Sequence, residues 1–318
     1  MKIYILVSIT LAVLSFVYLK LAYKFKIIDK PNERGSHTKI TVRGGGIIFP
    51  IAILLFFFMN DYQYPYFVLG VFLVSLISFL DDIYTLSVEI RFPFQLIAVF
   101  LVLYQLGVPL SPIYFSAIYI VLGIGIMNMF NFMDGINGIT CIYSIVVLSG
   151  LFFINLNEDI VHEDLIIFSA ISLLIFGFYN FRKTALFFAG DIGSVIMGLL
   201  IFFMGLLFAI KLSAPLIILL VIVYGADTGC TFLYRKFYTN ENVFDPHKHH
   251  IYHKLVDVKK ISHLKVSVSY AAIQLLMNVI LYNTYQLGLQ TQLFILFGTI
   301  TLFILIYTFL FHKLKIES

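Results

Sequence analysis

Eleven apolar runs divide this chain, and they constrain its fold more than any other feature. They lie at 3–22, 45–59, 64–80, 93–107, 113–128, 136–154, 165–178, 194–210, 213–227, 268–284 and 292–311. A helix needs about 20 apolar residues to cross a bilayer, so eleven such helices use most of the 318 residues. We therefore expect an all-α integral membrane protein with about eleven transmembrane helices, forming a single polytopic domain over residues 1–318.

Composition excludes the main alternatives to a membrane protein. Only 12% of the residues are charged and 61% are hydrophobic, whereas soluble domains carry about 25% charged residues. A soluble surface could not be covered with so few polar groups, and a disordered chain would hold far fewer aromatic residues. The two cysteines, Cys141 and Cys230, lie far apart in or beside apolar runs, which favours neither a disulfide framework nor a zinc site.

The basic residues predict the orientation. Nineteen of the 21 Lys and Arg residues fall on one side of an eleven-span arrangement, and Lys2 and Lys211 fall on the other. The positive-inside rule makes the basic side cytoplasmic. The N-terminus is then external and the C-terminus cytoplasmic. The opposite loop at 155–164 is acidic and lacks Lys and Arg, and the region 228–267 is expected to be a long cytoplasmic loop.

Five aspartates fall at the predicted cytoplasmic membrane edge: Asp81, Asp82, Asp134, Asp191 and Asp227. Carboxylates at that depth are costly unless they are paired, hydrated or bound to a cation. An adjacent pair such as Asp81 and Asp82 repels itself, so it favours a cation or a shared proton. We therefore expect an active site at the cytoplasmic face of the membrane.

A run rich in asparagine and glycine spans residues 128–138. It holds Asn128, Asn131, Asp134 and Asn137, and Gly135 leaves room for a ligand or another helix to approach the backbone. Amide and carboxylate oxygens suit magnesium, or the edge of a nucleobase, far better than zinc.

The segment Gly190-Asp191-Ile192-Gly193-Ser194 precedes an apolar run. Free backbone N–H groups and the positive end of a helix dipole attract phosphate there. Taken alone, the motif is better explained as an ordinary helix cap by Asp191 or Ser194.

Histidines and lysines alternate in the segment 245–254. Four of the eight histidines are there, namely His247, His249, His250 and His253. The interleaved lysines disfavour a transition metal and favour phosphate. A solvated basic loop is the alternative interpretation.

With Pro31-Asn32-Glu33-Arg34 and Arg43-Gly44-Gly45-Gly46, these motifs form an ordered set over residues 29–253. The set resembles the polyprenyl-phosphate N-acetylhexosamine-1-phosphate transferase family. Those membrane enzymes move a sugar 1-phosphate from a UDP-sugar to a lipid phosphate, and they share the eleven-span topology. The resemblance is closer to the bacterial initiating transferases for O-antigen, teichoic acid or capsule glycans. Phospho-MurNAc-pentapeptide transferase of peptidoglycan synthesis remains the alternative, although its asparagine/aspartate run and compact triple-histidine loop differ.

The resemblance implies roles for the charged residues. Asp191 and Asn131 would hold Mg²⁺, with Mn²⁺ as a substitute, together with the diphosphate. Asp81 and Asp82 would handle the acceptor phosphate, and Arg91 would hold the donor phosphates.

The resemblance also implies a donor pocket. Gly135, Asn137 and Phe188 would hold uracil, Phe188 by stacking, and the histidine segment would close over the diphosphate and sugar. The remaining expected substrate contacts are Arg43, Asn128, Asp134, His247, His249, His250 and His253.

The implied reaction transfers HexNAc 1-phosphate from a UDP-HexNAc such as UDP-GlcNAc to undecaprenyl phosphate in the bacterial cytoplasmic membrane, releasing UMP. We expect a single displacement, and a covalent intermediate on Asp81 or Asp82 is the alternative. Membrane lipid is an expected partner and nucleic acid is not, and a homodimer is left open. A membrane transporter, the rival of a different class, would need charged residues near mid-bilayer, and the acidic residues do not fall there.

Overall fold

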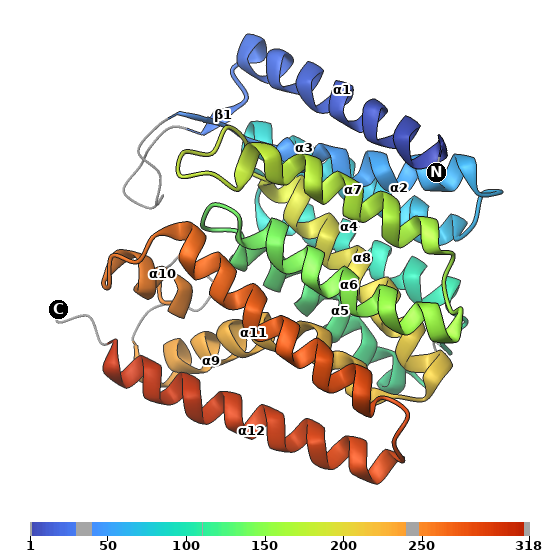
Figure 1. The fold of residues 1–318 in the computed structure, drawn as a ribbon, viewed down its shortest axis with the longest axis vertical. Coiled ribbons are helices and arrows are strands. Elements are labelled where there is room, and N and C mark those ends of the chain that lie inside the picture. The colour runs from blue at the N-terminus through green and yellow to red at the C-terminus, as the bar shows by residue number, and fades with distance from the viewer. Residues whose placement is uncertain (1, 30–39, 110, 240–247, 315–318) are drawn as a thin grey trace.

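A computed structural model describes residues 2–29, 40–109, 111–239 and 248–314. They form a bundle of roughly parallel and antiparallel helices (Figure 1). The first half contains α1 (Lys2–Phe25), β1 (Ile28–Asp29), β2 (Thr41–Val42), η1 (Gly45–Ile47), α2 (Ile48–Met59), α3 (Pro65–Tyr84), α4 (Val88–Gln105), α5 (Ile113–Met133) and α6 (Ile139–Glu158). The second half contains α7 (Glu163–Asn180), α8 (Gly190–Leu212), η2 (Pro215–Val221), α9 (Ile222–Tyr238), α10 (Ile251–Asp257), α11 (His263–Thr284) and α12 (Leu289–Lys313).

The expected all-α multi-pass class is confirmed. Within the described ranges, ten helical segments are long and apolar enough to cross a membrane, and Gly45–Met59 is a shorter apolar helix. Each of the eleven apolar runs thus lies in a helical segment. Figure 1 places the two chain ends at opposite ends of the bundle, as an odd number of spans requires. Which end faces the cytoplasm stays a prediction.

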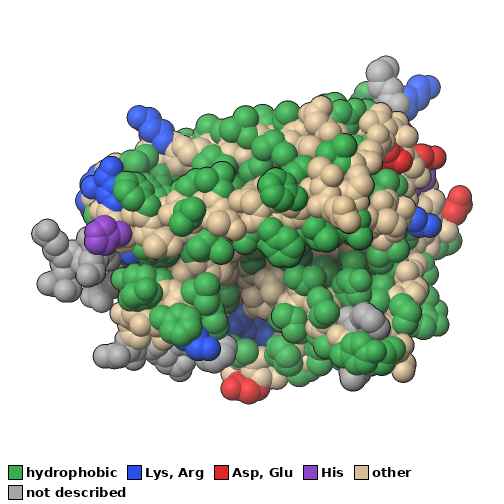
Figure 2. Space-filling view, turned by 90° about the horizontal axis from the view of Figure 1, so that it is seen from below, with side chains coloured by type: hydrophobic (Ala, Val, Ile, Leu, Met, Phe, Trp, Pro, Cys, Tyr) green, Lys and Arg blue, Asp and Glu red, His purple; other side chains and the backbone are tan. Residues whose placement is uncertain are grey.

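The helices differ strongly in how far the rest of the protein covers them. Helix α8 is the central one, because 72% of its most apolar 18-residue stretch is buried. Helix α12 is the most peripheral, with 17% of the corresponding stretch buried. Lipid-facing side chains therefore dominate α12, whereas α8 carries its N-terminus into the interior of the bundle. Figure 2 shows a broad hydrophobic surface, with most of the visible Lys and Arg toward one end and most Asp and Glu toward the other.

The ninth span is broken between η2 and α9, and buried polar groups from other helices compensate. Gln274 of α11 donates from Nε2 to the Leu219 carbonyl at 2.9 Å, and its Oε1 accepts from the Val223 N–H at 3.5 Å. Tyr143 of α6 donates to the same Oε1 at 2.7 Å. Backbone groups freed by a helix break inside a bilayer need such partners. Gln274 therefore stabilises the break between η2 and α9.

The segment 228–267 differs from the long loop that we expected. Helix α9 continues to Tyr238, α10 occupies part of the loop, and α11 begins at His263. Hydropathy falls after Asp227 although the helix continues, because the buried face of α9 includes the polar residues Thr231 and Arg235 there. The apolar pattern alone therefore ended this helix too early.

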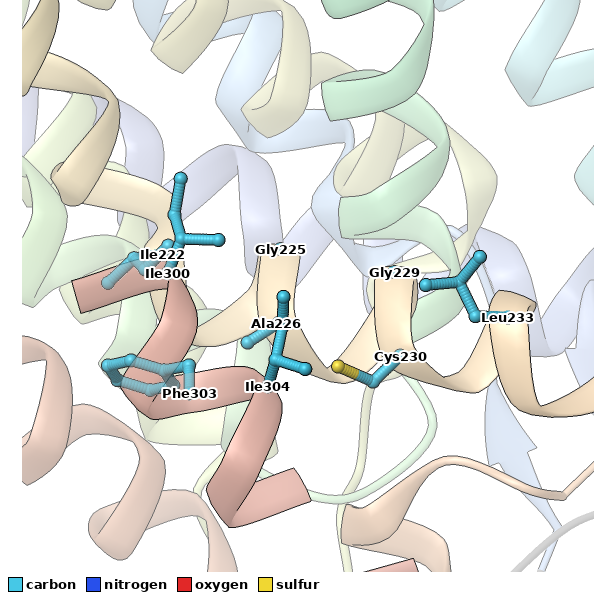
Figure 3. A pocket seen from close by; sticks show the side chains of 9 residues that line it. All are labelled: Ile222, Gly225, Ala226, Gly229, Cys230, Leu233, Ile300, Phe303 and Ile304. Atoms are coloured by element: carbon cyan, nitrogen blue, oxygen red, sulfur yellow. The ribbon is translucent and has the colours of Figure 1, made fainter. Parts of the chain in front are cut away.

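An apolar pocket of about 250 Å³ lies between α9 and α12. Small residues of α9 form one wall and larger side chains of α12 form the other (Figure 3). The lining residues are Ile222, Gly225, Ala226, Gly229, Cys230, Leu233, Ile300, Phe303 and Ile304.

Candidate active site

The polar motifs meet at one end of the bundle, where β1, α10 and the turn between α7 and α8 lie together (Figure 1). Strand β2 pairs with β1 in antiparallel register, Ile28 opposite Val42, and Val42 also bridges Phe187 in parallel. The backbone of Phe188 is held on both sides, donating to the Val42 carbonyl and accepting from the Gly45 N–H, each at 2.8 Å. The glycine loop and the segment before α8 are therefore one structural unit.

Asp82 is the centre of this unit. Its buried carboxylate accepts from Arg43 Nε at 2.7 Å and from the N–H groups of Asp191 at 3.0 Å and Ile192 at 3.2 Å. The two N–H groups are unpaired donors of the first turn of α8, where a negative charge is favoured. Gly190 has a φ of +72°, and a Cβ there would lie 2.3 Å from Asp82 Oδ2. Only glycine lets the carboxylate approach the helix this closely.

Arg91 joins the two other carboxylates of the cluster. Its Nη1 lies 3.0 Å from Asp81 Oδ2 and 2.6 Å from Asp191 Oδ2. Asp81 is fixed by the Leu86 N–H, which donates to its Oδ1. Arg43 Nη2 also reaches Asp191 Oδ1, at 3.5 Å. Asp191 is thus shared by both arginines and is the most exposed carboxylate of the three.

The charges of this network hold Arg43 in its cationic form. Burial alone would lower the pKa of Arg43, but the charges of Asp82 and Asp191 outweigh it and raise that pKa. Three carboxylates and two guanidinium groups alternate within hydrogen-bond distance. Such an arrangement can hold anionic oxygens and a cation side by side.

The asparagine run lies beside this network. On α5, Asn131 donates from Nδ2 to Ser194 Oγ at 3.2 Å, one helical turn beyond Asp191. Asn128 donates to Gln95 Oε1 at 3.1 Å. Asn131 therefore contacts α8 one helical turn beyond Asp191, and a magnesium site shared by these two residues stays a prediction.

Asp134 ends α5 and accepts from Thr140 Oγ1 at 2.6 Å. Desolvation, together with the charges of Asp191 and Asp82, raises the pKa of Asp134 to about 7, although the hydrogen bond from Thr140 opposes the shift. Asp134 therefore changes protonation near neutral pH and lies within electrostatic range of the charged network.

Gly135 provides the contact between the asparagine run and the histidine segment. A Cβ at Gly135 would lie 2.2 Å from Tyr252 Oη and 2.9 Å from His253 Nε2. Tyr252 Oη donates to the Phe132 carbonyl at 2.8 Å. His253 therefore lies against the turn that was expected to bind the donor.

Asn137, which was expected to contact uracil, binds the backbone of the turn between α7 and α8. Its Nδ2 donates to the carbonyls of Arg182 at 2.9 Å and Lys183 at 3.2 Å. Asn180, which sequence reasoning missed, accepts from the Gly138 N–H at 2.7 Å and donates to the Phe187 carbonyl at 2.8 Å. The only sign of this role in the sequence is that Asn180 is a polar residue at the end of an apolar run.

The expected histidines take different positions. His250 is nearly buried, with Nδ1 3.2 Å from Asp227 Oδ1. The ring of His249 lies 6.0 Å from that of Tyr234, whereas His253 lies at the Gly135 turn. His247 falls outside the described residues. Asp227, which had no assigned role, therefore anchors the histidine segment and stands apart from the arginine network.

The oxygen ligands at Asp191 and Asn131 fit a magnesium ion. No group of three or more His, Cys, Asp or Glu side chains in the described ranges could hold a metal unaided. Magnesium needs only one or two carboxylates, because substrate phosphates and water complete its shell. The donor set is consistent with a metal that arrives with a phosphate substrate.

Comparison with known proteins gives a consistent result. The model of glycosyl transferase family 4 matches residues 64–209. A protein of Bacillus subtilis (strain 168), named probable undecaprenyl-phosphate N-acetylglucosaminyl 1-phosphate transferase, is 27% identical over 278 residues, which are 80% of this chain and 76% of that protein. Over this segment, just under half of its length, the chain is similar to glycosyl transferase family 4. The expected kinship with polyprenyl-phosphate HexNAc-1-phosphate transferases is confirmed.

Two further proteins that are similar to this chain carry the name undecaprenyl-phosphate alpha-N-acetylglucosaminyl 1-phosphate transferase. The protein from Yersinia pestis is 26% identical over 267 residues, which are 76% of this chain and 72% of that protein. The protein from Thermotoga maritima is 25% identical over 296 residues, which are 87% of this chain and 86% of that protein.

The segment matched to family 4 contains only part of the site described above. Asp82, Arg91 and Asp191 lie within residues 64–209, whereas Arg43 and Asp227 lie outside. The fold thus completes the matched segment with a glycine loop from one side in sequence and a histidine segment from the other.

Proposed function

We propose that this enzyme transfers N-acetylglucosamine 1-phosphate from UDP-GlcNAc to undecaprenyl phosphate at the cytoplasmic face of a bacterial inner membrane. One observation carries the proposal: two arginines bridge three carboxylates at the polar end of an apolar bundle. That arrangement suits two phosphate substrates, one of which stays anchored in lipid. The names of the relatives support the choice of acceptor and sugar.

The reaction is a phosphoryl displacement. An oxygen of the lipid phosphate attacks the phosphorus that carries the sugar, and a new P–O bond forms. The bond from that phosphorus to the oxygen of UMP breaks, and UMP leaves with the electron pair. Both reactants are anions, so positioning and charge compensation provide most of the catalysis.

The charged network suggests how the chain divides this work. Arg91 contacts Asp81 on one side and Asp191 on the other. Acceptor phosphate beside Asp81 and donor diphosphate beside Asp191 would then lie on two sides of one guanidinium group. Asp191 and Asn131 would hold Mg²⁺, which supplies charge neutralisation of the diphosphate when bound.

The α9/α12 pocket offers the lipid tail an apolar surface near Asp227, which anchors the histidine segment. Cys230, in the pocket between α9 and α12, lies three residues beyond Asp227 on the same helix (Figure 3). Figure 2 shows a hollow in the apolar face with Lys or Arg side chains at its bottom. A hydrophobic chain in the bilayer could therefore bring its phosphate to the basic groups without leaving lipid.

The test is UMP release by purified protein in detergent with undecaprenyl phosphate and a panel of UDP-sugars, with and without EDTA. We expect release with UDP-GlcNAc that needs lipid phosphate and Mg²⁺. Asp191→Asn should lower it at least about hundredfold, because removing one such electrostatic group costs about 3 kcal/mol of transition-state stabilisation.

Asp159→Asn is the matched control. Asp159 is exposed at the other end of the bundle with a φ of +46°, a backbone conformation that asparagine tolerates, so activity should be unchanged. Turnover with UDP-MurNAc-pentapeptide alone would correct the donor and keep the reaction class. Folded protein that binds no uridine nucleotide would refute the proposal.

A further inference from the structure

Helix α10 carries His253 but cannot be stable on its own. It has seven residues, and isolated helices shorter than about 12 residues are marginal in water. Its position must therefore come from contacts with other elements. At its start, Asp227 of α9 accepts from the N–H groups of Ile251 at 3.1 Å and Tyr252 at 3.3 Å.

The middle of α10 is held by a different kind of contact. Lys254 is 2% exposed, and its Nζ lies 4.9 Å from the ring centroid of Tyr234 and 4.7 Å from that of Phe311. The two rings are stacked, 4.7 Å apart and 7° from parallel. An ammonium group over aromatic rings is attracted by their π-electrons, and more strongly when it is desolvated. Lys254, Tyr234 and Phe311 are called the aromatic clasp below.

The buried ammonium group of Lys254 has the rings of Tyr234 and Phe311 as its close partners. No ion pair to Lys254 occurs among the described residues. Burial lowers the pKa of Lys254, and the charge of Asp227 opposes that shift. Lysine is almost never fully buried without a partner, so the two rings are what keep the ammonium group inside.

The aromatic clasp gives the peripheral helix α12 a contact with α10. The buried residues Phe303, Tyr307 and Phe311 recur every four positions along α12 and form one narrow stripe. Figure 1 shows α12 at the outer edge of the bundle, with α9 and α10 beside it. The stripe ends on Lys254, so the last helix of the chain reaches the histidine segment.

We propose that the aromatic clasp fixes α10 so that His253 stays over the Gly135 turn, which makes Lys254 and Phe311 positioning residues of the donor site. His253 and Lys254 are consecutive on one short helix, so a rotation of α10 that frees Lys254 also moves His253. The proposal rests on the proposed transferase activity, because it assigns the donor to the Gly135 turn.

A loosened clasp has a defined kinetic effect. If α10 is in place only a fraction of the time, the apparent donor affinity falls by that fraction. The KM for UDP-GlcNAc should rise, whereas kcat at saturating donor should stay near the wild-type value because bound donor selects the ordered helix. A loss in kcat at unchanged KM would indicate a different role.

The variants are Lys254→Met, which keeps the length of the side chain but removes its charge, and Phe311→Leu. Lys254→Arg keeps the cation and serves as the conservative rescue. Phe309→Leu is the matched control, because Phe309 is 62% exposed on the same helix. KM and kcat are measured by UMP release, and hydrogen exchange of residues 251–257 is measured on the same detergent preparations.

We expect Lys254→Met and Phe311→Leu to raise the donor KM about tenfold, equal to about 1.4 kcal/mol, and to accelerate exchange in α10. Lys254→Arg and Phe309→Leu should match wild type in both readouts. Unchanged exchange and unchanged KM in Lys254→Met would overturn the proposal. If Lys254→Met does not fold, Phe311→Leu decides alone.

The failure of the clasp and the failure of the transferase proposal give different results. Wild-type protein that releases no UMP with any donor refutes the activity, and the exchange of α10 still reports on the clasp. Active wild type with normal exchange in both clasp variants refutes only the clasp.

Discussion

Replacing Gly190 with alanine tests the geometry of the charged network without changing any charge. The added Cβ would lie 2.3 Å from Asp82 Oδ2, and the backbone would keep a φ of +72°. The left-handed backbone costs about 1–2 kcal/mol for a non-glycine residue. The Asp82 side chain is fully buried and has no solvent to move into, so the carboxylate must withdraw from the first turn of α8.

The size of the effect follows from the bonds that are lost. Asp82 accepts from the N–H groups of Asp191 and Ile192, and a hydrogen bond to a charged group is worth about 1.5–3 kcal/mol. Losing one of them displaces Asp191 as well. We therefore expect kcat/KM to fall about ten- to hundredfold, together with a lower thermal unfolding temperature.

Gly205→Ala provides the control for this experiment. Gly205 lies in the same helix, and a Cβ there meets nothing within 4 Å. Alanine favours a helix over glycine by up to about 1 kcal/mol, so this variant should be fully active and no less stable. UMP release and unfolding are measured well below both unfolding temperatures. Gly190→Ala with activity within threefold of wild type would show that the close approach of Asp82 is unimportant.

Three further predictions concern the neighbouring turns. Gly135→Ala should raise the donor KM about tenfold, because its Cβ meets Tyr252 Oη at 2.2 Å; an unchanged KM in UMP release would contradict the contact. The pKa of Asp134 rises on folding to about 7, so its contribution to stability is present at low pH and is lost as pH rises from about 4 to about 7. Asp134→Asn should flatten that slope in thermal unfolding at pH 5 to 8, and an equal slope would argue against the shift. Asn180→Asp removes the donor to the Phe187 carbonyl and should destabilise by about 1–3 kcal/mol, seen as a several-degree drop in unfolding temperature; no drop would mean that this bond is dispensable.

The spans were predictable because lipid enforces a single rule. Every segment that crosses must be apolar and must satisfy its own backbone, and each apolar run accordingly lies in a helical segment. The break between η2 and α9 was not predictable, because its polar partners, Gln274 and Tyr143, lie on other helices. Periodicity reports on one helix at a time.

The sequence predicted a common depth for the five aspartates at the cytoplasmic membrane edge, which stays a prediction, but it did not predict which of them share partners. Asp81, Asp82 and Asp191 share two arginines, whereas Asp227 binds the start of α10. Chain position gives the depth of each aspartate but not its neighbours around the bundle axis. The roles of Asn180 and Lys254 were hidden for the same reason. Asn180 accepts from Gly138, 42 positions away, and Lys254 lies over Phe311 of the last helix.

The partners of Asp82 come from both sides of it in the chain, and this sets when the site can form. Arg43 is synthesised before Asp82, but the N–H groups of Asp191 and Ile192 follow more than a hundred residues later. A nascent chain that has inserted α3 holds a carboxylate with one arginine and without the helix end that completes its coordination. The catalytic centre is therefore a late product of membrane assembly, and a chain truncated before Gly190 would be inert rather than partly active.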